Sequence, residues 1–102
     1  MNTLTIEIRL AQVRNVITTD DSLVVDFDDG RTVSVPLAWY PRLLHGTPAE
    51  RKNWRLIGNG EGIHWRDLDE DISAEGLLSG HASNESQRSF KQWLEQRGQK
   101  KK

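Results

Sequence analysis

His64 is the side chain in this sequence whose type and surroundings come closest to supporting catalysis. In an extended segment it points away from both of its neighbours, and Asp67 or Glu61 could then orient its ring for proton transfer. Catalysis also needs a nucleophile or a bound substrate, and the chain has no Cys and no nucleophile-elbow motif. We therefore assign no catalytic residue and expect a non-enzyme, with an enzyme centred on His64 and the nearby acids as the third hypothesis.

Three carboxylates next to this histidine have the spacing of a calcium-binding loop. Asp67, Asp69 and Asp71 occupy the first, third and fifth positions of such a loop. The sixth position, which requires Gly, is Ile72, and the twelfth, which requires Glu, is Leu78. The pattern thus favours a solvated acidic turn, and we predict no metal site and no cofactor.

Aromatic and arginine side chains gather in the segment that holds Trp39, Tyr40 and Arg42. Two adjacent residues of a short helix cannot share one face, so either Trp39 or Tyr40 should reach the surface beside Arg42. Trp, Tyr and Arg dominate the hot spots of protein interfaces. We predict that these three residues form a partner-binding surface.

A second apolar surface lies near the C-terminus. Residues 85–97 have the pattern of an amphipathic helix that ends at Gly98, with a stripe formed by Phe90, Trp93 and Leu94. So short a helix is marginal alone, so the stripe must dock on its own domain, pair with another subunit, lie on an anionic surface or fold into a partner's groove. We favour docking on the domain and count the stripe as a candidate partner contact.

The formal net charge of −1 is the sum of two unlike parts. Residues 1–84 carry 8 basic and 13 acidic side chains, a net −5, whereas residues 85–102 carry 6 basic and 2 acidic ones, a net +4. Because phosphates attract clustered cations, nucleic-acid binding is possible only through the tail. This alternative function would use Arg88, Lys91, Arg97, Lys100, Lys101 and Lys102.

The first half of the chain has the period-two pattern of strands. Apolar residues alternate from Thr3 to Leu10 and again over residues 22–27, and Asp29-Gly30 suits a hairpin turn before a further strand over 33–37. The pattern then changes to helical spacing over residues 37–44, where Pro41 should kink a short helix.

The second half begins with Thr47-Pro48-Ala49-Glu50, a capping box that should start another short helix. Strands are expected over 54–57 and 62–65, joined by a type I′ turn at Asn59-Gly60 rather than by a phosphate-binding loop, since such loops lead into a helix. A short helix capped by Ser73 should end at Gly80.

These elements predict an α+β fold with an antiparallel β-meander plus a second hairpin, and short helices packed on the sheet. We expect a compact domain over residues 1–80, followed over 81–102 by a linker, the amphipathic helix and the basic tail. With no Cys, signal-peptide pattern or apolar run that could span a membrane, a cytoplasmic location is expected.

Several short motifs together resemble a known family. They are Asp29-Gly30, Val35-Pro36-Leu37, Trp39-Tyr40-Pro41-Arg42-Leu43, Trp54, Gly62-Ile63-His64-Trp65 and Asp69-Glu70-Asp71-Ile72. On these residues the chain, over roughly residues 11–80, is similar to the bacterial family catalogued as domain of unknown function 2442. The resemblance implies an accessory or regulatory role, because relatives are often encoded near toxin–antitoxin-type genes and some are fused to helix-turn-helix domains.

The leading functional hypothesis is a non-enzymatic interaction or regulatory module that acts by protein contact. It would be an accessory or antitoxin-like member of a bacterial pair, with an unidentified protein partner and a homo-oligomer as a further option. The C-terminal helix is too short to be a helix-turn-helix, so DNA reading by such a domain is not carried over.

Overall fold

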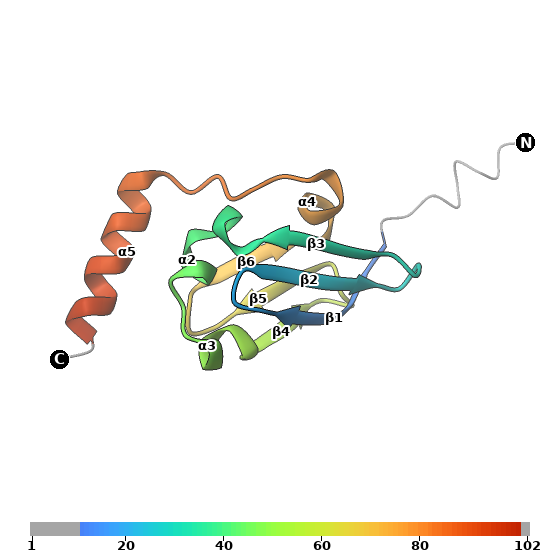
Figure 1. Cartoon of the computed structure of the whole chain (residues 1–102), viewed down its shortest axis with the longest axis horizontal. Coiled ribbons are helices and arrows are strands. Elements are labelled where there is room, and N and C mark those ends of the chain that lie inside the picture. The colour runs from blue at the N-terminus through green and yellow to red at the C-terminus, as the bar shows by residue number, and fades with distance from the viewer. Residues whose placement is uncertain (1–10, 101–102) are drawn as a thin grey trace, which may run out of the picture.

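Two three-stranded antiparallel sheets form the body of the protein. The computed structural model describes residues 11–100. The first sheet has the order β1-β2-β3, from Val13–Thr18, Ser22–Phe27 and Thr32–Pro36, and the second has the order β4-β5-β6, from Trp54–Ile57, Gly62–Trp65 and Glu70–Ser73. One sheet lies in front of the other in Figure 1. The predicted α+β class with a meander and a second hairpin is confirmed. The strand predicted over Thr3–Leu10 lies outside the described residues.

The core lies between the two sheets and is formed by buried apolar residues of both. Leu23 and Val25 of β2 are fully buried, as are Ile63 and Trp65 of β5. The indole nitrogen of Trp65 donates a hydrogen bond of 3.0 Å to the backbone carbonyl of Arg51. The largest buried side chain therefore has its polar atom satisfied, as a close-packed interior requires.

Three short helices connect the sheets: η1 (Leu37–Trp39), α2 (Pro41–Leu44) and α3 (Pro48–Lys52). The predicted break at Pro41 is confirmed, since this proline occupies the first turn of α2. The capping box is also confirmed, with Thr47 accepting from the Glu50 amide and Glu50 accepting from the Thr47 amide.

A buried arginine fixes the end of α2. Only 8% of Arg51 is exposed, and its Nη1 donates to the carbonyls of Leu43 and Gly46 at 3.1 and 2.7 Å. A cation at the C-terminal end of a helix meets the negative end of the backbone dipoles. Arg51 therefore holds α2 against α3.

The loop between β4 and β5 differs from the predicted type I′ turn. That turn needs positive φ at both Asn59 and Gly60, whereas the structure has positive φ at Gly58 and Gly60 and spans four residues between the strands. The longer loop lets the Gly60 carbonyl accept a 2.7 Å hydrogen bond from the Val13 amide. The turn is thus shaped by a contact with the first sheet, which local sequence does not encode.

The acidic turn predicted over 67–71 is wrong in its second half, because Glu70 begins strand β6. Only Ile72 of this strand is buried, so its sequence shows no alternating apolar pattern. The helix that follows, α4 (Ala74–Ser79), is capped by Ser73 and ends at Gly80 with φ of 76°, as predicted.

The last helix, α5 (Gln87–Lys100), continues through Gly98, so the predicted stop at this glycine is wrong. One Gly costs a helix about 1 kcal/mol, which does not suffice to end it. Among the described residues, no helix has the length and apolar character needed to cross a membrane.

Replacing Gly60 with Ala should lower the free energy of unfolding by about 2–4 kcal/mol. Its φ is +107°, and a Cβ there would lie 2.5 Å from the Val13 carbonyl oxygen. Gly30→Ala is the matched control, because φ is +94° but no atom lies within 4 Å. Urea denaturation of both variants tests this, and equal losses would show that the approach to Val13 is unimportant.

Candidate interaction surfaces

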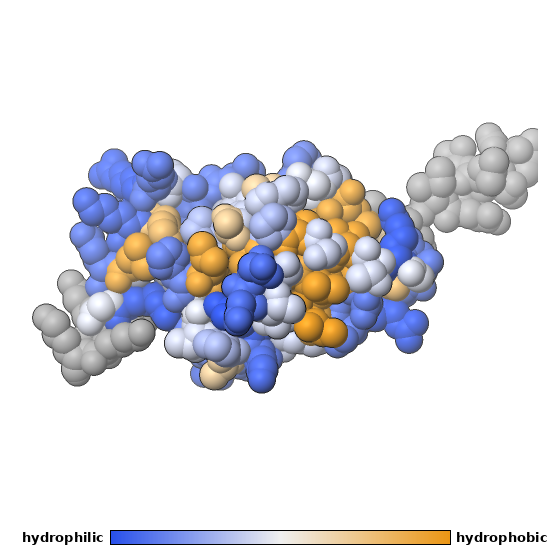
Figure 2. Space-filling view, viewed as in Figure 1, coloured by the Kyte–Doolittle hydropathy of each residue, from blue (hydrophilic) through white to orange (hydrophobic). Residues whose placement is uncertain are grey.

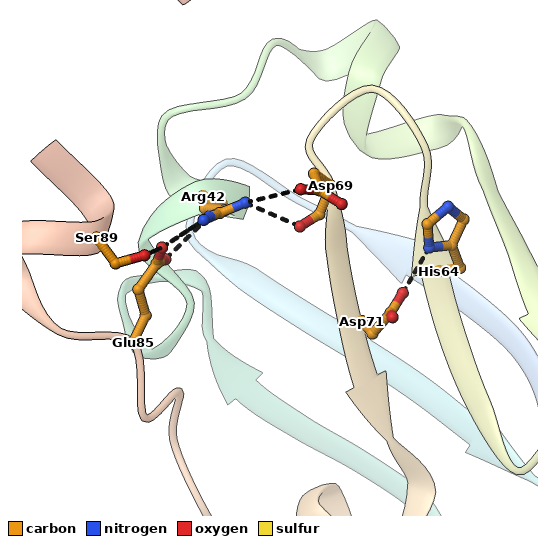
Figure 3. Close-up of polar contacts among 6 residues, drawn as sticks. All are labelled: Arg42, His64, Asp69, Asp71, Glu85 and Ser89. Carbon is orange, nitrogen blue, oxygen red and sulfur yellow. Dashed lines mark hydrogen bonds and ion pairs between the residues drawn. The ribbon is translucent and has the colours of Figure 1, made fainter. Parts of the chain in front are cut away.

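Arg42 of α2 joins three parts of the chain. Its guanidinium donates to both carboxylate oxygens of Glu85, from Nε at 3.0 Å, and through Nη1 to the backbone carbonyl of Asp69 at 2.9 Å. Glu85 also accepts from the Ser89 hydroxyl at 2.8 Å. Figure 3 shows Arg42 between Asp69 on one side and Glu85 on the other.

The Arg42–Glu85 pair is shielded from water, with 14% and 11% of the two side chains exposed. The hydrogen bonds of the pair raise the pKa of Arg42 and lower the pKa of Glu85. Both groups therefore stay charged near neutral pH. Loss of one member would leave the other as an uncompensated, largely buried charge.

Two guanidinium groups lie over the ring of Trp93 of α5. The centre of its ring lies 5.3 Å from Cζ of Arg42 and 4.8 Å from Cζ of Arg97, and only 8% of the residue is exposed. Arg97 in turn donates to both oxygens of Glu50 at 3.0 and 2.9 Å. The hydrogen bonds from Arg97 lower the pKa of Glu50 to about 2. We call Arg42, Glu50, Glu85, Trp93 and Arg97 the clamp.

The clamp includes one residue from each predicted partner-binding surface, and it holds α5 against its own domain. Tyr40 is buried, with its hydroxyl donating to the His81 carbonyl at 3.0 Å, and Trp39 is half-buried. Arg42 and Trp93 face each other, as described. The sequence offered no signal for these pairings, because Arg42 and Glu85 lie 43 residues apart. Contact of these four residues with a partner stays a prediction.

An apolar patch remains exposed next to the clamp. Leu44 is 43% exposed, and Phe90 and Leu94 are only partly buried. The Phe90 ring lies 5.2 Å from that of His45, the neighbour of Leu44, which brings α5 beside α2. Figure 2 shows apolar surface over this end of the molecule, separate from that over the first sheet. Leu44 was missed because its helical spacing indicated a core position.

His64 does not meet its predicted partners. Its Nδ1 faces Asp71 of the adjacent strand at 2.5 Å (Figure 3), whereas Asp67 accepts from Asn53 at 2.8 Å. The polar hollow beside Asp71, of about 340 Å³, has Glu70 and Tyr40 in its wall but not His64. Asp71 can therefore orient the imidazole of His64 as a proton acceptor. None of these contacts places a nucleophile beside the imidazole.

The three carboxylates with calcium-loop spacing turn to three different partners. Asp67 binds Asn53, Asp69 lies 3.5 Å from Nη1 of Arg42, and Asp71 faces His64. Among the described residues, no group of three potential ligands is placed to hold a metal ion.

The basic residues of the tail divide into two sets. Arg97 is engaged by Glu50, whereas Arg88 and Lys91 are exposed on α5. Lys100 ends the helix, and Lys101 and Lys102 lie outside the described residues. The cationic surface left on the described helix is therefore small.

Glu70 titrates far from the ordinary range of a glutamate. Burial at the second sheet raises its pKa to about 7, and the nearby Glu85, Asp71 and Asp69 add to this rise while Arg42 opposes it. The folded protein consequently retains a proton that the unfolded chain loses near pH 4.5.

We expect Glu70→Gln to be more stable than the unmodified protein above pH 7, by about 1–2 kcal/mol. Stability of the unmodified protein should fall as pH rises from 4.5 to 7, the interval in which only the unfolded state has lost its proton. Gln cannot ionise, so the variant should lack this fall. Parallel denaturation curves at pH 4, 6 and 8 measure the difference, and an unchanged difference across this range would contradict the assignment.

Arg42→Lys should reduce the free energy of unfolding by about 1–3 kcal/mol, because an ammonium cannot make the two-pronged contact with Glu85. The exposed Arg55 provides a control, since Arg55→Lys should change stability by under about 0.5 kcal/mol. Guanidinium denaturation followed by circular dichroism compares the two. Equal effects would mean that the clamp contributes nothing beyond charge.

Solved structures share this fold. A crystal structure of a protein of unknown function from Rhodospirillum rubrum matches with a TM-score of 0.65 and 23% identity, over 76% of this chain and 95% of that chain. A solution NMR structure of an uncharacterized protein from Chromobacterium violaceum matches with a TM-score of 0.63 and 21% identity, over 81% and 76%. No curated protein matches the chain. The sequence profile described as "Protein of unknown function (DUF2442)" matches residues 13–83, more than half of the chain, so the protein belongs to the DUF2442 family.

Proposed function

We propose that this protein is a non-enzymatic interaction module, the accessory, antitoxin-like member of a bacterial pair, and that it acts by protein contact. The observation that supports this is the apolar patch of Leu44, Phe90 and Leu94 beside the clamp. Exposed apolar side chains on a rigid base are typical of protein interfaces.

The patch is held in place by the clamp. Trp93 is held by contacts of its ring with two guanidiniums, and Phe90 and Leu94 are three residues before and one residue after it on α5. Their positions therefore do not depend on a partner. A surface that is ordered before binding loses less conformational entropy when it binds.

The charges around the patch indicate the partner's chemistry. Arg88 and Lys91 are exposed on α5, and Lys91 is one turn from Leu94. A partner surface that fits has an apolar centre and an acidic rim. Such a rim would speed association and select the partner more than it would add affinity.

Nucleic-acid binding by the tail is the second candidate, favoured by the exposure of the same Arg88 and Lys91. It predicts an affinity that falls steeply with salt. Two observations oppose this candidate. Arg97 is already paired with Glu50, and residues 1–84 carry a net charge of −5.

The test is affinity purification of tagged full-length protein from its host, with and without nuclease, followed by mass spectrometry. A protein recovered with the unmodified chain should survive nuclease and be reduced at least tenfold by Leu44→Glu combined with Leu94→Glu. The matched control is Ile17→Glu, which changes a large apolar residue on the first sheet that is 51% exposed, and it should leave recovery unchanged.

Two results would contradict the proposal. Recovery that disappears with nuclease would support the nucleic-acid candidate instead. Equal recovery by the double variant and the unmodified chain, with both shown to be folded by circular dichroism, would place the contact elsewhere.

A further inference from the structure

The hollow of about 340 Å³ lies at the edge of the second sheet that β6 forms. Its walls are β6 on one side and the segment between α4 and α5 on the other, and Figure 1 shows this segment running along the body from one helix to the other. The Tyr40 hydroxyl donates to the His81 carbonyl, and the Ser83 amide donates to the Trp39 carbonyl, both at 3.0 Å. The outer wall is therefore anchored to the domain.

Glu70 is the acidic side chain at the inner wall of the hollow. It shares a face of β6 with Ile72, which is only 4% exposed, so the carboxyl is turned inward and partly buried. Arg42, the cation that acts on it, donates instead to Glu85 and to the Asp69 carbonyl. Within residues 11–100 nothing donates a hydrogen bond to this carboxyl. A partly buried carboxyl without a donor carries a cost that a bound donor would remove.

A backbone carbonyl lies at the same edge. The Ala74 amide donates to the Glu61 carbonyl at 2.9 Å, so these residues form a hydrogen-bonded pair of the β5–β6 ladder. Because such pairs alternate with pairs without hydrogen bonds, Asp71 directs its N–H and C=O away from β5, to the edge where it lines the hollow. The side chain of Asp71 faces His64. The inner wall thus offers the Glu70 carboxyl and the Asp71 carbonyl as neighbouring acceptors.

We propose that this hollow binds a small organic cation, a guanidinium or primary ammonium compound, whose N–H groups donate to the Glu70 carboxylate and the Asp71 carbonyl. Its volume is at the lower end of the range of about 300–1,000 Å³ typical of small-molecule sites. No Lys or Arg of the described residues lines it, so no fixed cation competes with the ligand. The site goes beyond the proposed function and is independent of it, since Leu44, Phe90 and Leu94 do not line the hollow.

The surrounding charges favour a cation over a neutral ligand. Glu85, Asp71 and Asp69 act on Glu70 with like charge, and Arg42, which opposes them, is shared with Glu85. In the free protein, burial and these carboxylates keep Glu70 protonated almost to neutral pH. A bound cation compensates the ionised form, so binding should release this proton, and the affinity should rise as the pH increases from 5 to 8.

Isothermal titration calorimetry of agmatine into the full-length protein tests the site, at about 0.15 M salt so that exposed charges are screened. The affinity should fall about tenfold or more in Glu70→Gln, which loses a charge-assisted hydrogen bond. Glu75→Gln removes the same charge from an exposed residue of α4 that does not line the hollow, and it should leave the affinity unchanged. Tetramethylammonium, a cation without N–H groups, should also bind about tenfold more weakly than agmatine.

Proton release distinguishes this contact from a general attraction between charges. At pH 6 the measured heat should depend on the ionisation enthalpy of the buffer, because Glu70 gives up its proton, and this dependence should be absent in Glu70→Gln. Histidine side chains also change charge in this pH range, and His81 lines the hollow while His64 faces Asp71. His81→Gln and His64→Gln should therefore both retain the release that Glu70→Gln lacks.

Three results would overturn the proposal. The first is no binding of agmatine at pH 8 up to about 10 mM, which is weaker than any specific site of this kind. The second is equal affinity of Glu70→Gln and Glu75→Gln, with both shown to be folded by circular dichroism. The third is binding at pH 6 without release of a proton.

Discussion

The contact of Arg42 with Glu85 holds together parts of the chain that share no backbone ladder. Arg42 follows Pro41 in the first turn of α2. Its guanidinium donates to the carbonyl of Asp69 in the β5–β6 loop and to the carboxylate of Glu85, which precedes α5. The guanidinium of Arg42 also contacts the ring of Trp93. Together these contacts hold α5 and the polar segment before it in a defined position on the domain. The exposure of Leu44, Phe90 and Leu94 on that surface depends on this one cation.

Local chemistry determined which features could be predicted. Proline at the first turn of α2, the Thr47–Glu50 capping box and the Ser73 cap act within a few residues, so their patterns were sufficient. The class of the first sheet could be predicted because alternating apolar residues indicate a strand with one buried face, whatever that face packs against. Strand β6 was missed because pairing with β5, rather than its own composition, makes Glu70–Ser73 extended.

The candidate site was harder to predict, for a physical reason. Side chains of the right types were identified, but Arg42 and Trp93 turn toward each other and not toward solvent. The pairing of Arg97 with Glu50 joins residues 47 apart, and the orientation of His64 toward Asp71 rests on a strand that the sequence pattern did not reveal. Partners distant in sequence are decided by tertiary packing, which periodicity does not report.

Glu50 has two roles, in capping α3 and in binding Arg97, and this links two events that look separate. Its Oε1 accepts both from the Thr47 amide at the start of α3 and from Nη2 of Arg97 on α5. Release of α5 would free this carboxylate to solvent and loosen the first turn of α3, and fraying of α3 would weaken the hold on α5. The two helices are therefore thermodynamically coupled, and the amide hydrogen exchange of α3 would report on the state of α5.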